Sequence, residues 1–141
     1  MAKPSFTRVP SDDCEVPVGD QVYNVHEGEW VEVLPIRLVG DNRFFVTVNR
    51  LQVELQAVQG DDDESARVSE IMARHFDRVV EFIRPRIGAW SWTDLESRPL
   101  PQPHDDPDVF TRISSEELLY LTRIVQTGRP AAAVEAEAKN A

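Results

Sequence analysis

The sequence predicts an α+β fold: a small N-terminal β-hairpin or sheet followed by two or three helices, with a proline-rich extended connector and flexible tails. Two observations carry this prediction. Residues 21–39 are rich in β-branched and aromatic side chains that alternate with polar ones, which is typical of strands. Residues 65–84 repeat apolar side chains at spacings of three and four, which is typical of an amphipathic helix.

The length of 141 residues fits one domain with tails. We expect residues 1–20 to form a flexible N-terminal arm, because prolines and a glycine interrupt a stretch without sustained periodicity. Residues 21–128 should form a single α+β domain. Residues 129–141 are rich in alanine and charged residues, so they are predicted to be a disordered C-terminal tail.

The β region contains a turn-like sequence, His26-Glu-Gly-Glu29, between two apolar stretches. The second stretch, residues 30–38, alternates with period two and is predicted to be a strand. The natural interpretation is a hairpin whose turn lies near Gly28. Pro35 cannot donate a ladder hydrogen bond, so it should place this strand at a sheet edge or break it with a bulge.

Residues 43–59 fit two interpretations. Helical spacing relates Phe44, Val48, Leu51, Leu55 and Val58, which favours a helix that Asp41 or Asn42 would cap. Yet the β-branched residues between 46 and 53 raise strand propensity, and their alternation changes parity, as in a bulged strand. We favour the helix, with the strand as the alternative.

The long helix predicted over residues 65–84 has one wide apolar stripe and an opposite charged face. His75 lies inside the stripe, so we expect it to be packed or half-buried and not to act as a base or metal ligand. Five prolines then make residues 85–113 an extended connector. Ser114 and Glu117 form a capping box ahead of the last apolar helix.

The sequence contains no recognisable catalytic motif: no G-x-S-x-G, no H-E-x-x-H, no P-loop and no G-x-G-x-x-G. The single cysteine, Cys14, cannot form an intrachain disulfide, and its acidic neighbours should raise the pKa of its thiol. The three histidines are isolated from one another, which disfavours a metal site. We therefore predict a non-enzymatic protein without a metal or cofactor.

The formal net charge is -10, from 25 acidic and 15 basic residues. Such an acidic surface opposes nucleic-acid binding and favours a partner with a basic surface. No apolar run approaches the roughly 18–20 residues that a membrane span needs. The first residues lack the apolar core of a signal peptide, so the expected location is the cytoplasm.

Two tryptophans of the connector share one side if the segment around them is a short strand. They either cover the long helix as core or face a partner, because tryptophan is frequent at binding hot spots. The candidate partner-binding residues are these two and three apolar residues of the last helix, namely Trp90, Trp92, Leu118, Leu121 and Ile124.

Several short phrases resemble the tail assembly chaperones of long-tailed (siphovirus-type) bacteriophages. They are Gly28-Glu-Trp-Val31, Trp90-Ser-Trp-Thr-Asp94, Pro99-Leu-Pro101 and the Glu116-Glu-Leu start of the last helix. The order of elements over residues 21–128 and the alanine-rich tail are similar as well. The sequence departs from the family pattern at Glu96-Ser97, where a turn glycine is common.

The resemblance implies a non-catalytic protein that works in the host cell cytoplasm during virion assembly and is absent from the finished particle. It would bind the tape-measure protein, help to recruit tail-tube subunits and self-associate as a homo-oligomer at high concentration. The alternative is a structural virion protein, such as a head–tail connector or a tail-associated component. A third interpretation, an acidic mimic of DNA, is disfavoured because the long helix mixes acidic and basic residues.

Overall fold

The computed structural model describes residues 6–34 and 42–127, without the side chains of residues 42–45 and 127. This part of the chain has the predicted α+β fold, with N-terminal antiparallel strands followed by three helices. The order is β1 (Thr7–Pro10), β2 (Glu15–Val18), β3 (Gln21–Asn24), β4 (Trp30–Val33), α1 (Asn42–Val58), α2 (Glu64–Ile83), β5 (Ile87–Trp90) and α3 (Ser115–Thr127). There are also two short 3-10 helices. The first, η1 (Arg84–Arg86), lies between α2 and β5, and the second, η2 (Pro107–Thr111), lies between β5 and α3.

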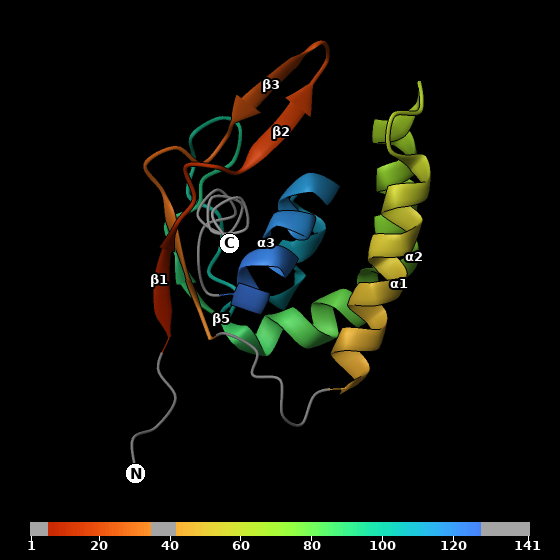
Figure 1. The fold of residues 1–141 in the computed structure, drawn as a ribbon. Helices are drawn as coiled ribbons and strands as arrows, with labels where there is room; N and C mark the ends of the chain where they lie inside the picture. The colour runs from red at the N-terminus through yellow and green to blue at the C-terminus, as the bar shows by residue number, and fades with distance from the viewer. Residues whose placement is uncertain (1–5, 35–41, 128–141) are drawn as a thin grey trace, which may run out of the picture.

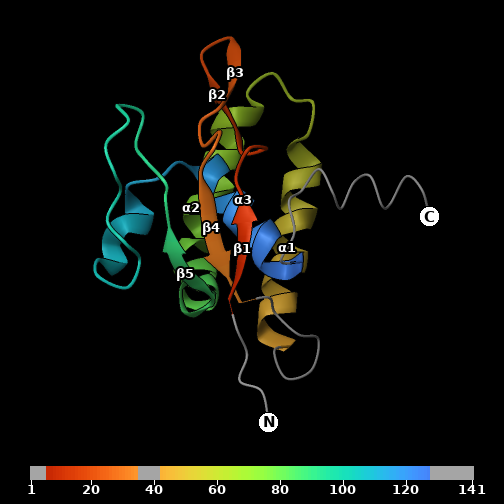
Figure 2. The same cartoon turned by 90° about the vertical axis from the view of Figure 1, so that its left-hand side faces the viewer.

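A three-stranded antiparallel sheet in the order β1-β4-β5 forms one layer of the molecule. Helix α3 lies between this sheet and the α1–α2 pair, as Figures 1 and 2 show from two directions. Val9 of β1 pairs with Val31 of β4, and both side chains are buried. Since directly paired residues point to the same face of a sheet, this face carries the β contribution to the core.

The predicted hairpin between residues 21–25 and 30–38 is wrong, although its turn exists. The Glu29 amide donates to the His26 carbonyl at 3.0 Å, and Gly28 has a φ of +77°. The strands on either side of this turn belong to different sheets, because β3 pairs with β2 and β4 pairs with β1. Strand β4 is the central strand of its sheet, and Pro35 lies outside the described residues.

The prediction of a flexible arm over residues 1–20 needs correction for the described residues 6–20. This segment supplies β1 and β2, and Cys14 between them is fully buried. Pro10 and Pro17 are accommodated in strands at sheet edges, where a missing amide donor costs little. The core therefore begins earlier in the chain than predicted, and the predicted tail over 129–141 lies outside the described residues.

Residues 42–58 form a helix, as favoured over the strand alternative, and α1 packs along α2. The stripe of α2 buries Ile71, Met72, Val79 and Ile83, and Pro85 lies just beyond its end in η1. His75 is half-buried, as predicted, and its ring is hydrogen-bonded to Glu54 of α1. Within the described residues, no helix has both the length and the apolar content of a membrane-spanning segment.

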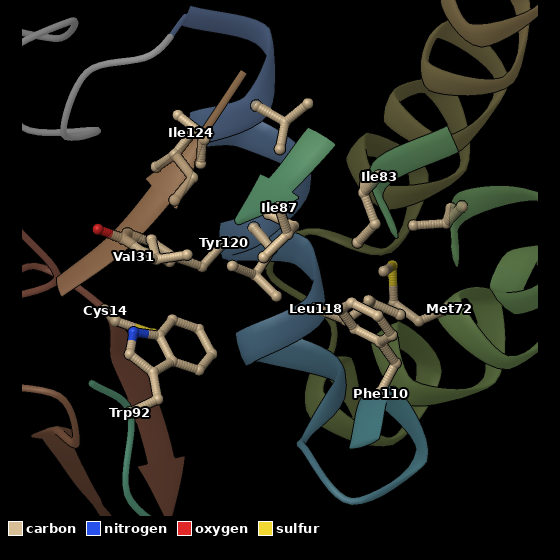
Figure 3. Close-up of a cluster of buried hydrophobic side chains, with 14 of the residues drawn as sticks. Cys14, Val31, Met72, Ile83, Ile87, Trp92, Phe110, Leu118, Tyr120 and Ile124 are labelled. Atoms are coloured by element: carbon tan, nitrogen blue, oxygen red, sulfur yellow. The ribbon is translucent and has the colours of Figure 1, made fainter. Parts of the chain in front are cut away.

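One hydrophobic cluster joins the strands, the helices and the connector. In Figure 3, Phe110 of η2 and Met72 of α2 lie against Leu118 of α3, while Trp92 of the connector lies beside Cys14. Helix α3 thus contacts two parts of the core, one around Met72 and Phe110 and the other around Cys14 and Trp92. Its start is the predicted capping box: the Glu117 amide donates to Ser114 Oγ at 3.1 Å, and the Ser114 amide donates to Glu117 Oε1 at 3.0 Å.

Candidate functional site

The most concentrated group of titratable side chains surrounds His26, which is 1% exposed. Its Nδ1 lies 2.6 Å from Glu29 Oε1, and its Nε2 lies 2.5 Å from Glu117 Oε2. The ring stacks on Trp92, with centroids 3.8 Å apart and planes 10° from parallel. We call His26, Glu29 and Glu117 the Glu–His–Glu cluster. It joins the turn before β4 to the first turn of α3.

Further hydrogen bonds link both carboxylates of the cluster to the surrounding chain. Glu29 also accepts from the Thr93 amide at 2.9 Å and from the Thr93 hydroxyl at 2.6 Å. Glu117 also accepts from the Ser114 amide. Each carboxylate thus joins His26 to a second segment, the connector at Thr93 through Glu29 and the start of α3 through Glu117.

Burial and hydrogen bonding act in opposite directions on the pKa of the Glu117 carboxyl. Burial acts to raise the pKa of the Glu117 carboxyl, but hydrogen bonds from His26 and from the Ser114 amide outweigh it and hold this pKa below its ordinary value. A carboxyl with a lowered pKa in the folded state stabilises the fold above its unfolded-state pKa. That stabilisation is lost as the pH falls through the folded-state pKa.

We expect this effect to appear when wild type is compared with Glu117→Gln, which keeps a capping residue at the same position. The variant should be less stable at neutral pH, and the difference in free energy of unfolding should shrink as the pH falls from about 5 towards 2. Urea titrations across this pH range measure it. A difference that stays constant with pH would contradict the assignment, and the exposed Glu81→Gln serves as the control.

Two further polar groups are buried beside the cluster. Burial, with the nearby charges of Glu117 and Asp13, raises the pKa of the Cys14 thiol far above its ordinary value. Burial and a hydrogen bond to Asp13 Oδ1 at 2.8 Å likewise raise the pKa of the Tyr120 hydroxyl. The predicted upward shift at Cys14 is confirmed, although burial contributes more than its acidic neighbours. Both groups stay protonated and are poor nucleophiles in this environment.

The cluster is arranged to hold elements together. Both ring nitrogens of His26 are engaged by carboxylates, one beside it in the turn before β4 and one in the first turn of α3. Trp92 adds a hydrogen bond from Nε1 to Ser11 Oγ at 2.9 Å, so the N-terminal segment joins the same network. Among the described residues, no group of three or more His, Cys, Asp or Glu side chains has the arrangement of a metal site.

No protein-family model, curated protein or solved structure matches this chain.

The five predicted partner-binding residues belong to the core. The side chains of Trp90, Trp92, Leu118, Leu121 and Ile124 are all at most 2% exposed. The prediction that they form a contact surface needs correction, because none of them reaches the surface of this fold. The interpretation of the tryptophan pair as core agrees with the structure: both side chains are buried, and the two rings stack with centroids 5.0 Å apart.

The phrases that carry the family resemblance meet in space. Glu29 of the first phrase binds Thr93 of the second, and the Trp30 amide donates to Ser91 Oγ at 2.8 Å. Glu117 of the last phrase binds His26, which lies just before the first. These phrases therefore specify one buried network. His26 and Glu29, three residues apart, lie within the turn-like sequence noted above, but no local signal links them to Glu117.

The departure from the family pattern at Glu96-Ser97 also has a structural counterpart. Ser97 has a φ of +64°, in the left-handed region that favours glycine. Asp94 holds this turn by accepting from the amides of Glu96 and Arg98 at 2.9 and 3.0 Å. The turn thus forms with serine in the position where glycine would be unstrained.

Replacing Ser97 with glycine is therefore expected to raise the free energy of unfolding by roughly 0.5–1 kcal/mol, since relief of strain exceeds the added chain entropy. Ser65→Gly, in the first turn of α2, should lower it by a similar amount because that backbone is already helical. Chemical denaturation of both variants measures whether each change raises or lowers the free energy of unfolding. Destabilisation by Ser97→Gly would show that the hydroxyl matters more than the backbone strain.

Proposed function

We propose that this protein is a non-catalytic binding protein that acts as a tail assembly chaperone of long-tailed bacteriophages. In this role it binds the tape-measure protein in the host cell cytoplasm and helps to recruit tail-tube subunits. The family assignment is supported by the sequence phrases described above. The binding role is supported by apolar side chains exposed on the surface.

The observation that carries the binding role is the β2–β3 hairpin, which projects from the body of the molecule beside the helices (Figure 1). It exposes apolar side chains on a strongly acidic chain: Val22 is 61% exposed, Tyr23 50% and Val18 46%. The strand β3 has no buried residue at all. Large apolar side chains gathered on one protruding element are typical of a protein contact surface.

The Glu–His–Glu cluster is compatible with the proposed binding role. His26, the most enclosed histidine of the described residues, is occupied by two carboxylates and linked to α3. This network joins the turn before β4 to α3 inside the fold. The exposed apolar hairpin on the outer surface suits a chaperone that keeps a partner soluble.

Co-expression with the tape-measure protein of the same phage tests the proposal. We expect the tape-measure protein to move from the insoluble to the soluble fraction and to co-purify with this chain. The double variant Val22→Ser and Tyr23→Ser should reduce co-purification, while Val53→Ser, at an exposed valine of α1, should not. A tape-measure protein that stays insoluble refutes the chaperone role. Stoichiometric amounts of this chain in purified virions would instead support a structural component.

A further inference from the structure

A groove of about 510 Å³ opens between the three helices and the β2–β3 hairpin. In Figure 1 the hairpin and the α1–α2 turn rise on opposite sides of α3. The groove is lined by apolar side chains from four elements, namely Pro17 of β2, Leu55 of α1, Val68 of α2 and Leu119 of α3. The last three are only partly buried, so the core does not use their full apolar surface.

The exposed hairpin extends this apolar surface. Pro17 pairs directly with Val22 across the two strands, and paired side chains lie on the same face of a hairpin. Val22 therefore lies on the face that Pro17 turns to the groove. A partner that fills the groove would also cover Val22, whose exposure within this chain is otherwise unexplained.

The charges at the groove are predominantly negative. The α1–α2 loop presents exposed Asp61, Asp62 and Asp63, followed by Glu64 at the groove, and Glu116 lines it from the first turn of α3. Arg67 pairs with two of the loop aspartates, and Arg123 lines the groove two turns further along α3. Five carboxylates thus outnumber two guanidinium groups in and beside the groove, so its end near Glu116 is acidic. The cation further along α3 is Arg123.

We propose that this groove binds an amphipathic helix of a protein partner, with apolar residues on one face and Lys or Arg beside them. The proposal rests on the protein-binding role proposed above and specifies its partner chemistry. The volume suits a few inserted side chains and not a whole helix, which is the pattern of helix-in-groove recognition. The basic flank would lie towards Glu64 and Glu116, where the charges are complementary.

A model peptide tests the groove independently of any phage protein. The probe is a fluorescein-labelled 18-residue helix of leucine and lysine, with leucine on one face. A twin with glutamate in place of lysine and a scrambled sequence serve as comparison peptides. We expect the lysine peptide to bind the full chain with saturable anisotropy, weakened by added salt, and the two comparison peptides to bind much less.

A pair of matched variants locates the binding. Glu116→Lys reverses a groove charge, and Glu81→Lys makes the same change on an exposed part of α2 outside the groove. We expect Glu116→Lys to weaken peptide binding roughly three- to tenfold and Glu81→Lys to change it little. Val22→Ser should weaken it as well, and Val53→Ser should not. Thermal unfolding confirms that each variant is folded.

The groove proposal is overturned if the lysine peptide does not saturate, if the glutamate twin binds as well, or if the two lysine variants act equally. It is also overturned if Glu116→Lys abolishes self-association of the chain instead, because the occupant would then be a second copy. These outcomes are separate from the co-expression result. A soluble tape-measure protein with an unresponsive groove leaves the chaperone role standing, and a binding groove with an insoluble tape-measure protein refutes only that role.

Discussion

Replacing His26 with alanine is expected to lower the free energy of unfolding by about 3–5 kcal/mol, because it leaves two carboxylates near the core without their shared partner. The substitution also removes the ring that stacks on Trp92 and leaves a cavity in its place. Urea denaturation at neutral pH measures the loss. We expect this to be among the most damaging single changes in the chain.

The matched control is His75→Ala, which removes another histidine that binds a glutamate. His75 is partly exposed, and water can solvate Glu54 once the ring is gone, so the loss should be clearly smaller. In a double-mutant cycle, His26→Ala and Glu117→Gln should be strongly non-additive because each removes the same contact. Equal effects of the two histidine changes, or additivity in the cycle, would show that the Glu–His–Glu cluster does not hold the fold together.

Replacing Trp92 with alanine is expected to cost a similar amount, about 3–5 kcal/mol. The indole stacks with both His26 and Trp90, and its Nε1 donates to Ser11. Its removal separates the N-terminal segment from the connector and deprives His26 of its apolar support. Denaturation monitored by far-ultraviolet circular dichroism measures the loss without relying on tryptophan fluorescence.

Trp30→Ala provides the same substitution at a partly exposed site, where the ring is covered by the Arg8 guanidinium at 3.8 Å from its centroid. A cation–π contact at such a site contributes roughly 0.5–1 kcal/mol, so this variant should lose much less stability than Trp92→Ala. A second variant, Trp92→Phe, should fall between the two because it keeps a stacking ring but loses the indole donor. Comparable losses at Trp30 and Trp92 would contradict the central role given to the stacked rings.

The helices could be predicted because their signals are local. The apolar stripe of α2 and the capping box at Ser114 are contained within a few turns of chain, and both are confirmed. Residues 43–59 were ambiguous because β-branched side chains favour strands, but packing against α2 outweighs that preference. The left-handed backbone at Ser97 was not predicted, because the sequence has no glycine at the position where the family pattern has one.

The strand pairing and the candidate site could not be predicted, because their partners are far apart in the chain. Strands of four residues carry little register information, and β4 pairs with two segments on opposite sides of it in the sequence. Nothing near His26 indicates that Glu117, 91 residues later, completes its hydrogen bonds. Tryptophan suits both a core and a binding surface, so residue type alone could not place Trp90 and Trp92.

The long span of these contacts has a consequence for synthesis of the protein. Pro10 and Asp13 meet Tyr120 across more than 100 positions, and His26 meets Glu117 across 91. The β1–β4 and β2–β3 pairs can form from residues that are made early, but their hydrogen bonds to Glu117 and Tyr120 must wait until α3 has left the ribosome. Closing such long loops is slow. The contacts that join the first strands to the last helix are therefore the last to be completed during synthesis.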